Sequence, residues 1–238
     1  MIKPTSTRGD VRARIIEVAA VLLRDHGVAA VTTRGVAEGA DVQPPTIYRL
    51  FGDKDGLLES VAEHVLAEHV SMKRRITETA ASQGVDPLVD LHDGWLTQVE
   101  FGIANPELFR MMNGPQHLTR SRAAQAGMDV LRARIHRVAE TGRLRVSEQR
   151  ALGLVQAAGV GTISVLLATP AEDRDDELAD AMFDAVMRQI LADPPDREQD
   201  DHAAAAVAFR AITPALDTLS AAERAVMVEW LDRVIAGL

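Results

Sequence analysis

Residues 31–58 read V-T-T-R-G-V-A-E-G-A-D-V-Q-P-P-T-I-Y-R-L-F-G-D-K-D-G-L-L, and this stretch decides the fold. Its pattern predicts a short helix, a tight turn, a second short helix and the start of a third. Two helices joined in this way form a helix-turn-helix, which places its second helix in the major groove of DNA. The stretch therefore predicts a helical DNA-binding domain.

Single residues mark where these helices begin and turn. Thr32 is suited to cap the first helix, because its hydroxyl can accept a backbone N–H group that has no partner within the helix. Asp41 is expected in the turn, in the left-handed conformation that Gly adopts best and Asp tolerates. Pro44 and Pro45 are expected to open the second helix, since the first turn does not need their missing N–H groups. Lys54 should begin the third helix, beside free N–H groups that also attract phosphate.

The second short helix is expected to have one buried and one exposed face. Ile47 and Phe51 lie four residues apart, so they share the face that we expect to be buried. Thr46, Tyr48 and Arg49 are then left pointing outward. The outward face is the one available to DNA.

The stretch resembles the DNA-binding domain of the TetR family of bacterial transcriptional regulators. The residues that match the family pattern are Thr32, Val36, Ala37, Ala40, Asp41, Val42, Thr46, Ile47, Tyr48, Phe51, Lys54, Leu57 and Leu58. Three positions depart from it: Asp41 replaces the turn Gly, Gln43 replaces the Ser that opens the recognition helix, and Gly35 replaces an acidic residue, so no capping box forms there. These departures remove no DNA-contacting residue type, but Gln43 and the Pro pair can alter which bases are read.

The resemblance implies a DNA-contacting surface and a homodimer. Tyr48, Thr46 and Lys54 would hold phosphates, whereas Arg49, Gln43 and Pro44 would lie nearest to base edges, and Arg49 is suited to pair with guanine. The full set of residues expected at the DNA is Thr32, Thr33, Arg34, Gln43, Pro44, Pro45, Thr46, Tyr48, Arg49 and Lys54. Two-fold symmetry would give a palindromic operator, with recognition helices about 35 Å apart or a multiple of that spacing.

Charge is distributed unevenly along the chain. The net charge is −9, yet residues 1–60 carry eight basic and eight acidic side chains, so the acidic excess lies in residues 61–238. The first 14 residues are locally basic, with Lys3, Arg8, Arg12 and Arg14 facing only Asp10. These arginines either reach phosphates or are solvated, and the sequence leaves both open. We expect modest non-specific DNA affinity that falls steeply with salt.

Helical periodicity continues to the C-terminus and predicts an all-α fold. Besides the helix-turn-helix, helices are expected at 11–26, 56–76, 87–103, 106–112, 120–140, 147–168, 176–191, 202–212 and 220–235, with a loop at 80–86. We divide the chain into a three-helix DNA-binding domain (1–55), a helical regulatory and dimerisation domain (56–192), and an acidic linker with a C-terminal helical extension (193–238). Ser220 and Glu223 form a capping box for the last helix. The extension could cover the regulatory domain, extend the dimer or dock a partner.

The helix predicted at 147–168 carries no charge from residue 151 onward. It nearly meets the length of a membrane span, but its polar residues and three Gly favour a soluble role. Gly153, Ala157 and Gly161 recur every four residues, which gives a flat strip for close helix approach. In TetR-like dimers the last two long helices pair with those of the partner. We therefore expect dimerisation through residues 147–168 and 176–191, with a core role within one chain as the alternative.

The regulatory region is expected to hold a small apolar or amphipathic ligand, an expectation that rests chiefly on the resemblance. The residues expected at the ligand are Trp95, Gln98, Phe109, Met112 and Met128. Met and aromatic side chains at helical spacing are also typical of an ordinary core. In the family, the connecting helix at 56–76 transmits ligand-induced movement. The basic run at 72–75 is interpreted as a solvated face.

Several function classes are excluded or disfavoured. The chain has no Cys, which excludes disulfides, thiolate catalysis and Cys-based metal sites. It lacks the motifs of phosphate-binding loops, zinc proteases and serine hydrolases, so we expect neither an enzyme nor a cofactor. His64 and His69 lie five apart and are poor metal co-ligands. The first ten residues contain no apolar segment of the kind found in secretory signal peptides, so a cytoplasmic location is expected. The main prediction is a repressor that a small-molecule ligand releases from its operator. The alternative is a DNA-binding regulator of the same fold that is controlled by a protein partner.

Overall fold

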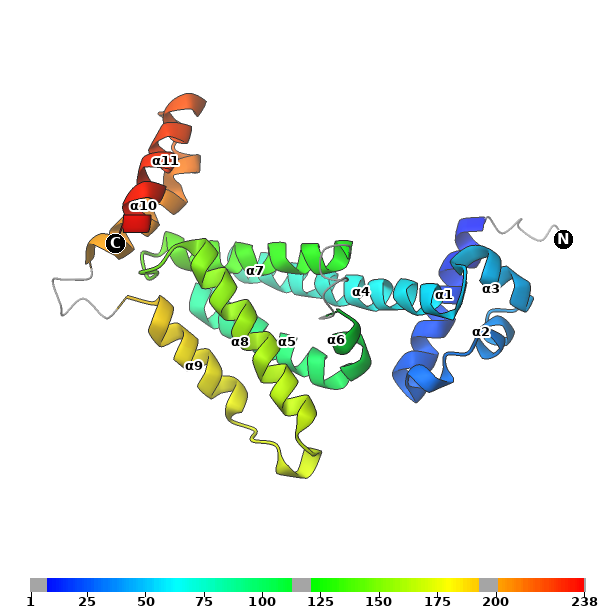
Figure 1. The fold of residues 1–238 in the computed structure, drawn as a ribbon. Coiled ribbons are helices and arrows are strands. Elements are labelled where there is room, and N and C mark those ends of the chain that lie inside the picture. The colour runs from blue at the N-terminus through cyan, green and yellow to red at the C-terminus, as the bar shows by residue number, and fades with distance from the viewer. Residues whose placement is uncertain (1–7, 113–120, 193–200, 238) are drawn as a thin grey trace. The chain divides into compact units, whose positions relative to one another are not determined.

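The computed structural model describes residues 8–112, 121–192 and 201–237. Within these ranges every regular element is a helix, and one isolated bridge pairs Leu144 with Leu191 (Figure 1). The all-α prediction is confirmed. The α-helices are α1 Arg8–His26, α2 Thr33–Gly39, α3 Pro44–Phe51, α4 Lys54–Ser82, α5 Pro87–Ala104, α6 Pro106–Met112, α7 Arg122–Glu140, α8 Glu148–Ala168, α9 Leu178–Ile190, α10 Asp201–Ile212 and α11 Ala221–Gly237. Short 3-10 helices are η1 Val28–Ala30, η2 Ala171–Asp173 and η3 Thr213–Ala215.

The chain forms two compact units. The first contains Met1–Met72 and Asn105–Gly127, and the second contains Lys73–Ala104 and Met128–Leu238. Helices α4 and α7 each pass from one unit into the other. This is a different division from the three expected domains, whose boundaries stay a prediction.

An apolar core holds the helices of the first unit together. Its fully buried side chains include Ile15 of α1, Val36 of α2, Ile47 of α3 and Leu57 of α4. Helices α1 and α2 approach closely at Gly39, where a Cβ atom would lie 2.7 Å from Val18 Cγ1. Further along, Glu63 of α4 fixes the start of α7, since its carboxylate accepts hydrogen bonds from Ser121 Oγ and the Ala123 N–H. The predicted burial of Ile47 is confirmed.

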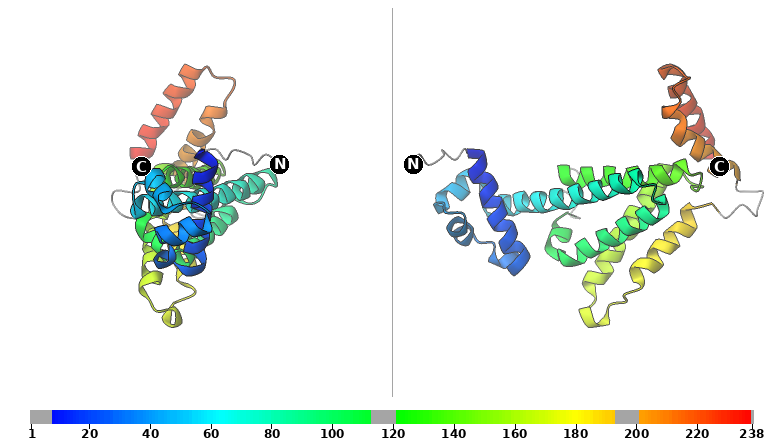
Figure 2. Two further views of the ribbon diagram at one scale, coloured as in Figure 1. Left: turned by 90° about the vertical axis from the view of Figure 1, so that its right-hand side faces the viewer. Right: turned by 180° about the vertical axis from the view of Figure 1, so that it is seen from behind.

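Helices α5, α8 and α9 form the centre of the second unit around Trp95. Its indole Nε1 donates to the carbonyl oxygen of Ala179 in α9 at 2.9 Å, and its ring lies 5.9 Å from that of Phe183. Helix α8 approaches α5 closely at Gly102, where a Cβ would lie 2.7 Å from Ile163. Helices α8 and α9 run antiparallel, side by side (Figures 1 and 2). The unit is thus a small helical bundle closed by aromatic contacts.

Several helix predictions need correction. Helix α4 continues to Ser82, so the loop expected from residue 80 begins later. Helical spacing predicts that Leu178, Met182, Val186 and Ile190 of α9 face inward. Of these only Ile190 is buried, while the other three are half-buried and Ala179, Phe183 and Met187 are buried instead. The buried face is therefore rotated by one residue, because Phe183 packs on Trp95 and His92 of α5.

The interpretation of residues 72–75 as a solvated face is wrong at Lys73. Its side chain is only 7% exposed, and Nζ donates to Gln98 Oε1 of α5 at 2.8 Å. Burial and the nearby charge of Arg134 lower the pKa of Lys73 from 10.5 to about 8. Periodicity could not show this, because a basic run is by default assigned to solvent.

Asp90 lies at the centre of a second group of buried charges. One carboxylate oxygen accepts from Arg134 Nε at 3.2 Å, and the other accepts from Arg137 at 2.7 Å. Gly94, one turn along α5, makes room for Arg134, since a Cβ there would lie 1.9 Å from the guanidinium. The interior of the second unit is therefore partly ionic.

The C-terminal extension folds as a helical hairpin of α10 and α11. Helix α10 buries Ala204, Val207 and Ala211, and Gly142, which follows α7, approaches it, because a Cβ there would lie 3.8 Å from Ala208. Helix α11 has no buried residue. Its predicted capping box is confirmed by reciprocal hydrogen bonds between Ser220 and Glu223. The expected linker falls on residues 193–200, outside the described ranges.

Candidate nucleic-acid interface

The first short helix and the turn are built as the sequence predicts. Thr32 caps α2, because its Oγ1 accepts the N–H of Gly35 at 3.0 Å. Asp41 adopts a φ of 50°, which makes it the one described non-glycine residue in the left-handed region. The turn closes when the N–H of Val42 donates to the carbonyl oxygen of Ala37 at 2.9 Å. Asp41 thus takes the backbone role that Gly has in the family pattern.

Helix α3 begins with Gln43 at its N-cap and with both prolines in the first turn. The Gln43 backbone is extended, and its side chain makes no capping hydrogen bond. The N–H of Thr46 donates to the Gln43 carbonyl oxygen at 2.8 Å, so the turn closes without the missing proline N–H groups. The exposed Gln43 amide is therefore not used in capping and is available to an external partner.

The two faces of α3 differ as predicted at Ile47, Tyr48 and Arg49, but not at Thr46 and Phe51. Ile47 is fully buried, Phe51 is half-buried, and Tyr48 is 52% exposed. Arg49 is exposed and Thr46 is half-buried. The exposed residues of the expected set on and around α3 are Gln43, Pro44, Pro45, Tyr48, Arg49 and Lys54. A phenol, a guanidinium, an amide and an ammonium group are therefore presented from one short segment.

Helix α4 begins beside this surface. Asp53 Oδ1 accepts the N–H of Gly56 at 2.8 Å, which caps the helix, and Lys54 follows as its first residue. A Cβ at Gly56 would lie 2.2 Å from the carbonyl oxygen of Phe51, so only Gly fits between α3 and α4. On α2, Thr32 and Arg34 are exposed and Thr33 is half-buried. The expected set therefore spans the N-terminal ends of α2, α3 and α4, where free N–H groups favour anions.

Arg12 has a role that sequence reasoning missed. Its guanidinium lies 5.0 Å from the centre of the Phe51 ring, and its NH2 group donates to Ser60 Oγ at 3.0 Å. It therefore links α1 to both α3 and α4, which supports the recognition helix from behind. No local signal reveals this contact, because Arg12 and Ser60 are 48 positions apart. The expected N-terminal arm falls mainly on residues 1–7, outside the described ranges.

The residues expected at a ligand fall in both units. Trp95, Gln98 and Met128 belong to the second, while Phe109 and Met112 lie on α6 in the first. Trp95 is buried and uses its N–H within the bundle, Gln98 accepts from Lys73, and Met128 is half-buried. Phe109 is half-buried, and the side chain of Met112 falls outside the description. Their assignment to a ligand stays a prediction.

The small-residue strip of α8 is exposed. Gly153, Ala157 and Gly161 face solvent, and no atom lies within 4 Å of a Cβ built at either glycine. Val165, one turn further, is 55% exposed. By length and composition this helix could cross a membrane, but core helices of soluble proteins pass the same test. A flat, uncharged strip on the surface fits the close approach of another helix.

Comparison with known sequences gives matches in the N-terminal part of the chain. The family described as "Bacterial regulatory proteins, tetR family" matches residues 15–61. The transcriptional regulator BetI of Paraburkholderia phymatum is 32% identical over 71 residues, which are 29% of this chain and 36% of BetI. The class A tetracycline repressor from transposon 1721 of Escherichia coli is 44% identical over 55 residues, 23% of this chain and 26% of the repressor. The chain thus matches about a third of the length of these relatives, or less.

Solved structures extend the likeness to most of the chain. RolR in complex with resorcinol aligns with a TM-score of 0.60 at 21% identity, over 85% of this chain and 95% of RolR. A TetR transcription regulator from Haloarcula marismortui aligns with a TM-score of 0.55 at 18% identity, over 77% of this chain and all of that one. At such low identity these alignments show the shared fold alone.

Proposed function

Because residues 15–61 match the tetR family of bacterial regulatory proteins, we propose that the chain is a member of that family and a sequence-specific, DNA-binding transcriptional regulator of the cytoplasm. The observation that carries this proposal is α3, a helix with a fully buried Ile47 behind and exposed Tyr48 and Arg49 in front. Tyr48 and Lys54 hold phosphates, whereas Arg49 and Gln43 read base edges. The matched relatives are named as regulators, so we assign no catalytic activity.

The regulator acts as a homodimer. The partner lies against the exposed strip of α8 at Gly153, Ala157 and Gly161, with α9 beside it, so that two helices from each chain form a four-helix bundle. Two copies of α3 then enter successive major grooves about 35 Å apart, on a palindromic operator. Dimerisation also doubles the contacts of a domain whose charge is balanced and whose non-specific affinity is therefore modest.

Ligand binding releases the operator, and the protein is a repressor. The ligand is small and apolar or amphipathic, and its site in the second unit includes Trp95, Gln98 and Met128. Support comes from the fold shared with RolR, which was solved with resorcinol. Binding favours a dimer geometry in which the two copies of α3 no longer match the operator spacing, which requires different ligand affinity for the two geometries.

The recognition face is tested on an operator selected from random DNA with the purified protein. Gel shifts should show that Tyr48→Ala weakens binding to all sequences about tenfold, through a lost phosphate contact. Arg49→Ala should relax specificity at one guanine, because a bidentate pair discriminates by about 1–3 kcal/mol. Arg24→Ala is the matched control, since Arg24 is exposed at the far end of α1. Binding unchanged in both variants would overturn the assignment of α3.

A protein-controlled regulator is the second candidate. It is favoured by apolar side chains of the C-terminal hairpin that face solvent, including Phe209, Trp230 and Val234. Replacing Trp230 and Val234 by Ser separates the two candidates. If a ligand still releases the operator from this variant, the hairpin is not the sensor.

A further inference from the structure

A large open cavity lies between the C-terminal hairpin and the region where α7 leads into α8. Its volume is about 1330 Å³, and all its lining residues belong to the second unit. It is separate from the residues proposed above for the ligand, none of which lines it. The C-terminal hairpin of α10 and α11, which forms one wall of the cavity, is not part of the TetR family pattern.

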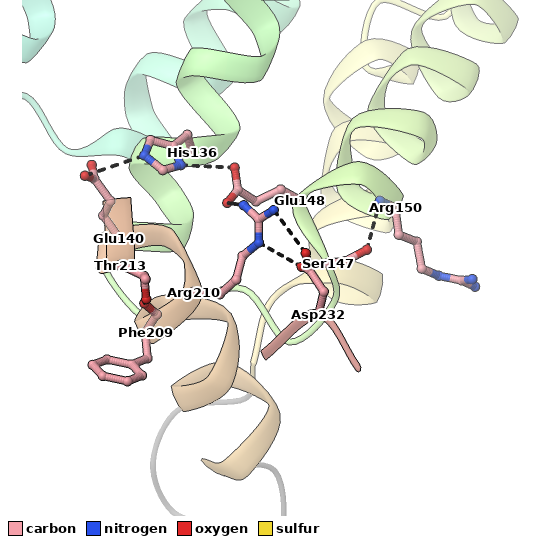
Figure 3. A network of polar contacts seen from close by, with 9 residues as sticks. All are labelled: His136, Glu140, Ser147, Glu148, Arg150, Phe209, Arg210, Thr213 and Asp232. Carbon is pink, nitrogen blue, oxygen red and sulfur yellow. Dashed lines mark hydrogen bonds and ion pairs between the residues drawn. The ribbon is translucent and has the colours of Figure 1, made fainter. Parts of the chain in front are cut away.

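The walls of the cavity carry more positive than negative charge. Four arginines line it, namely Arg132, Arg145, Arg150 and Arg210, against the two carboxylates Glu148 and Asp232. Two of these arginines are already paired. Arg132 pairs with Asp129 within α7, and Arg210 binds Asp232 at 2.8 Å and Glu148 at 3.7 Å (Figure 3). The positive excess therefore rests on Arg145 and Arg150.

Arg145 is held in place, and among the described residues it has no carboxylate partner. Its Nε and NH2 groups donate to the carbonyl oxygens of Gln189 and Arg188, at 3.1 and 2.9 Å. Main-chain carbonyls satisfy hydrogen bonds but supply no counter-charge. The guanidinium is thus fixed in orientation by α9 while its charge remains available to an anion.

Arg150 is free of such contacts. Among the described residues its side chain makes no hydrogen bond or ion pair, and in Figure 3 it points away from the network of His136, Glu148 and Arg210. Only its backbone N–H is engaged, with Ser147 Oγ at 3.3 Å. It lies in the first turn of α8, where the helix dipole adds to the positive potential. Arg145 and Arg150 both line the cavity, so one guanidinium of fixed orientation and one free guanidinium are available to an anion there.

The rest of the wall combines the polar side chains of Ser147, Gln149 and Gln189 with apolar ones. Leu152 of α8, Val207 of α10 and Ile235 of α11 line the same cavity. From the charge of Arg145 and Arg150 and these apolar side chains, we infer that the cavity binds an amphipathic organic anion. A carboxylate, sulfonate or phosphate group lies at the two arginines, and the hydrocarbon part of the ligand lies between α8 and the hairpin. The Arg210 network holds the hairpin in place and does not itself bind the anion.

The test compares two dyes that differ only in the sulfonate group: anilinonaphthalene sulfonate, which is an anion, and the same anilinonaphthalene without the sulfonate, which is neutral. Fluorescence titration of the full-length protein should show that Arg150→Gln weakens the sulfonate dye about fivefold, roughly the loss of one charge-assisted hydrogen bond at a half-open site. The neutral dye should bind equally well to both proteins. Because the Arg150 side chain contacts no partner among the described residues, the variant should unfold at the same temperature as the parent protein.

Two further variants locate the effect. Arg74→Gln removes one exposed positive charge from α4 in the second unit, and should leave both dyes unchanged. Ile235→Asp introduces a carboxylate in the apolar part of the wall, and should weaken both dyes. Unchanged sulfonate binding in Arg150→Gln, or an equal loss in Arg74→Gln, would overturn the inference. No DNA enters the experiment, so its failure would leave the proposed regulator untouched.

Discussion

The interiors of the two units contain different kinds of side chain. The core behind α3 consists of apolar side chains such as Ile15, Val36 and Ile47. The second unit instead buries Lys73, Asp90 and Arg134 among its helices. An apolar core tolerates small rearrangements, because its contacts are non-directional. Buried charges require fixed partners, so the second unit should be more sensitive to single changes of charge and to pH.

Removal of the Asp90 carboxylate should have the largest effect. Asp90→Ala leaves Arg134, which is 3% exposed, and Arg137 without their shared counter-ion. An uncompensated buried charge costs about 3–5 kcal/mol, so the free energy of unfolding should fall by that amount. Urea unfolding of Asp90→Ala and of Asp93→Ala measures the difference, since Asp93 is exposed on the same helix. Equal stability of the two variants would show that the buried ion cluster is not structurally important.

Lys73 should give a smaller effect of opposite sign. Its pKa is lowered to about 8, so the buried ammonium charge lowers the stability of the folded protein at neutral pH. Lys73→Met removes that charge and keeps the length of the chain, but loses the hydrogen bond to Gln98. We expect the variant to be more stable by about 1–2 kcal/mol at pH 7.

The pH dependence of stability provides the check on Lys73. Below pH 8 both the folded and the unfolded chain are protonated at this residue, and the cost of the buried charge is fully present. Between pH 8 and 10.5 the folded chain releases a proton that the unfolded chain retains, so stability rises with pH. Thermal unfolding across this window should show a rise in the parent protein that Lys73→Met lacks. Parallel curves would contradict the assignment.

The first unit could be predicted from the sequence more fully than the second. The helix-turn-helix could be predicted from the sequence, because Thr32 and Pro44 act on their immediate neighbours and because Ile47 and Phe51 repeat at helical spacing. The exposed face of α3 followed from that spacing.

What could not be predicted depends on contacts between distant parts of the chain. Lys73 and Asp90 are charged, so their burial depends on Gln98 and Arg134, which lie 25 and 44 positions away. The rotation of α9 depends on the rings of α5, and the cavity beside Arg150 depends on where the hairpin docks. Helical periodicity gives the orientation of one helix, but not the partner that it meets.

The turn at Asp41 provides the smallest and most local test of the comparison. The first unit has its strain in the backbone, since Asp41 has a φ of 50°. Gly adopts this conformation without steric cost, while Ala at such a position costs about 1–2 kcal/mol. Asp41→Gly should therefore stabilise the protein by about 0.5 kcal/mol, because greater freedom of the unfolded chain offsets part of the gain.

Asp41→Ala is the matched variant for this position. It should be less stable than the parent protein, since Ala lacks the short polar side chain that helps Asp tolerate the left-handed region. Thermal unfolding should rank the three proteins as Gly, Asp and Ala, from most to least stable. If the Ala variant were as stable as the Gly variant, the turn would not be strained. The first unit would then differ from the second only in its buried charges, and the departure from the family pattern at Asp41 would have no cost for folding.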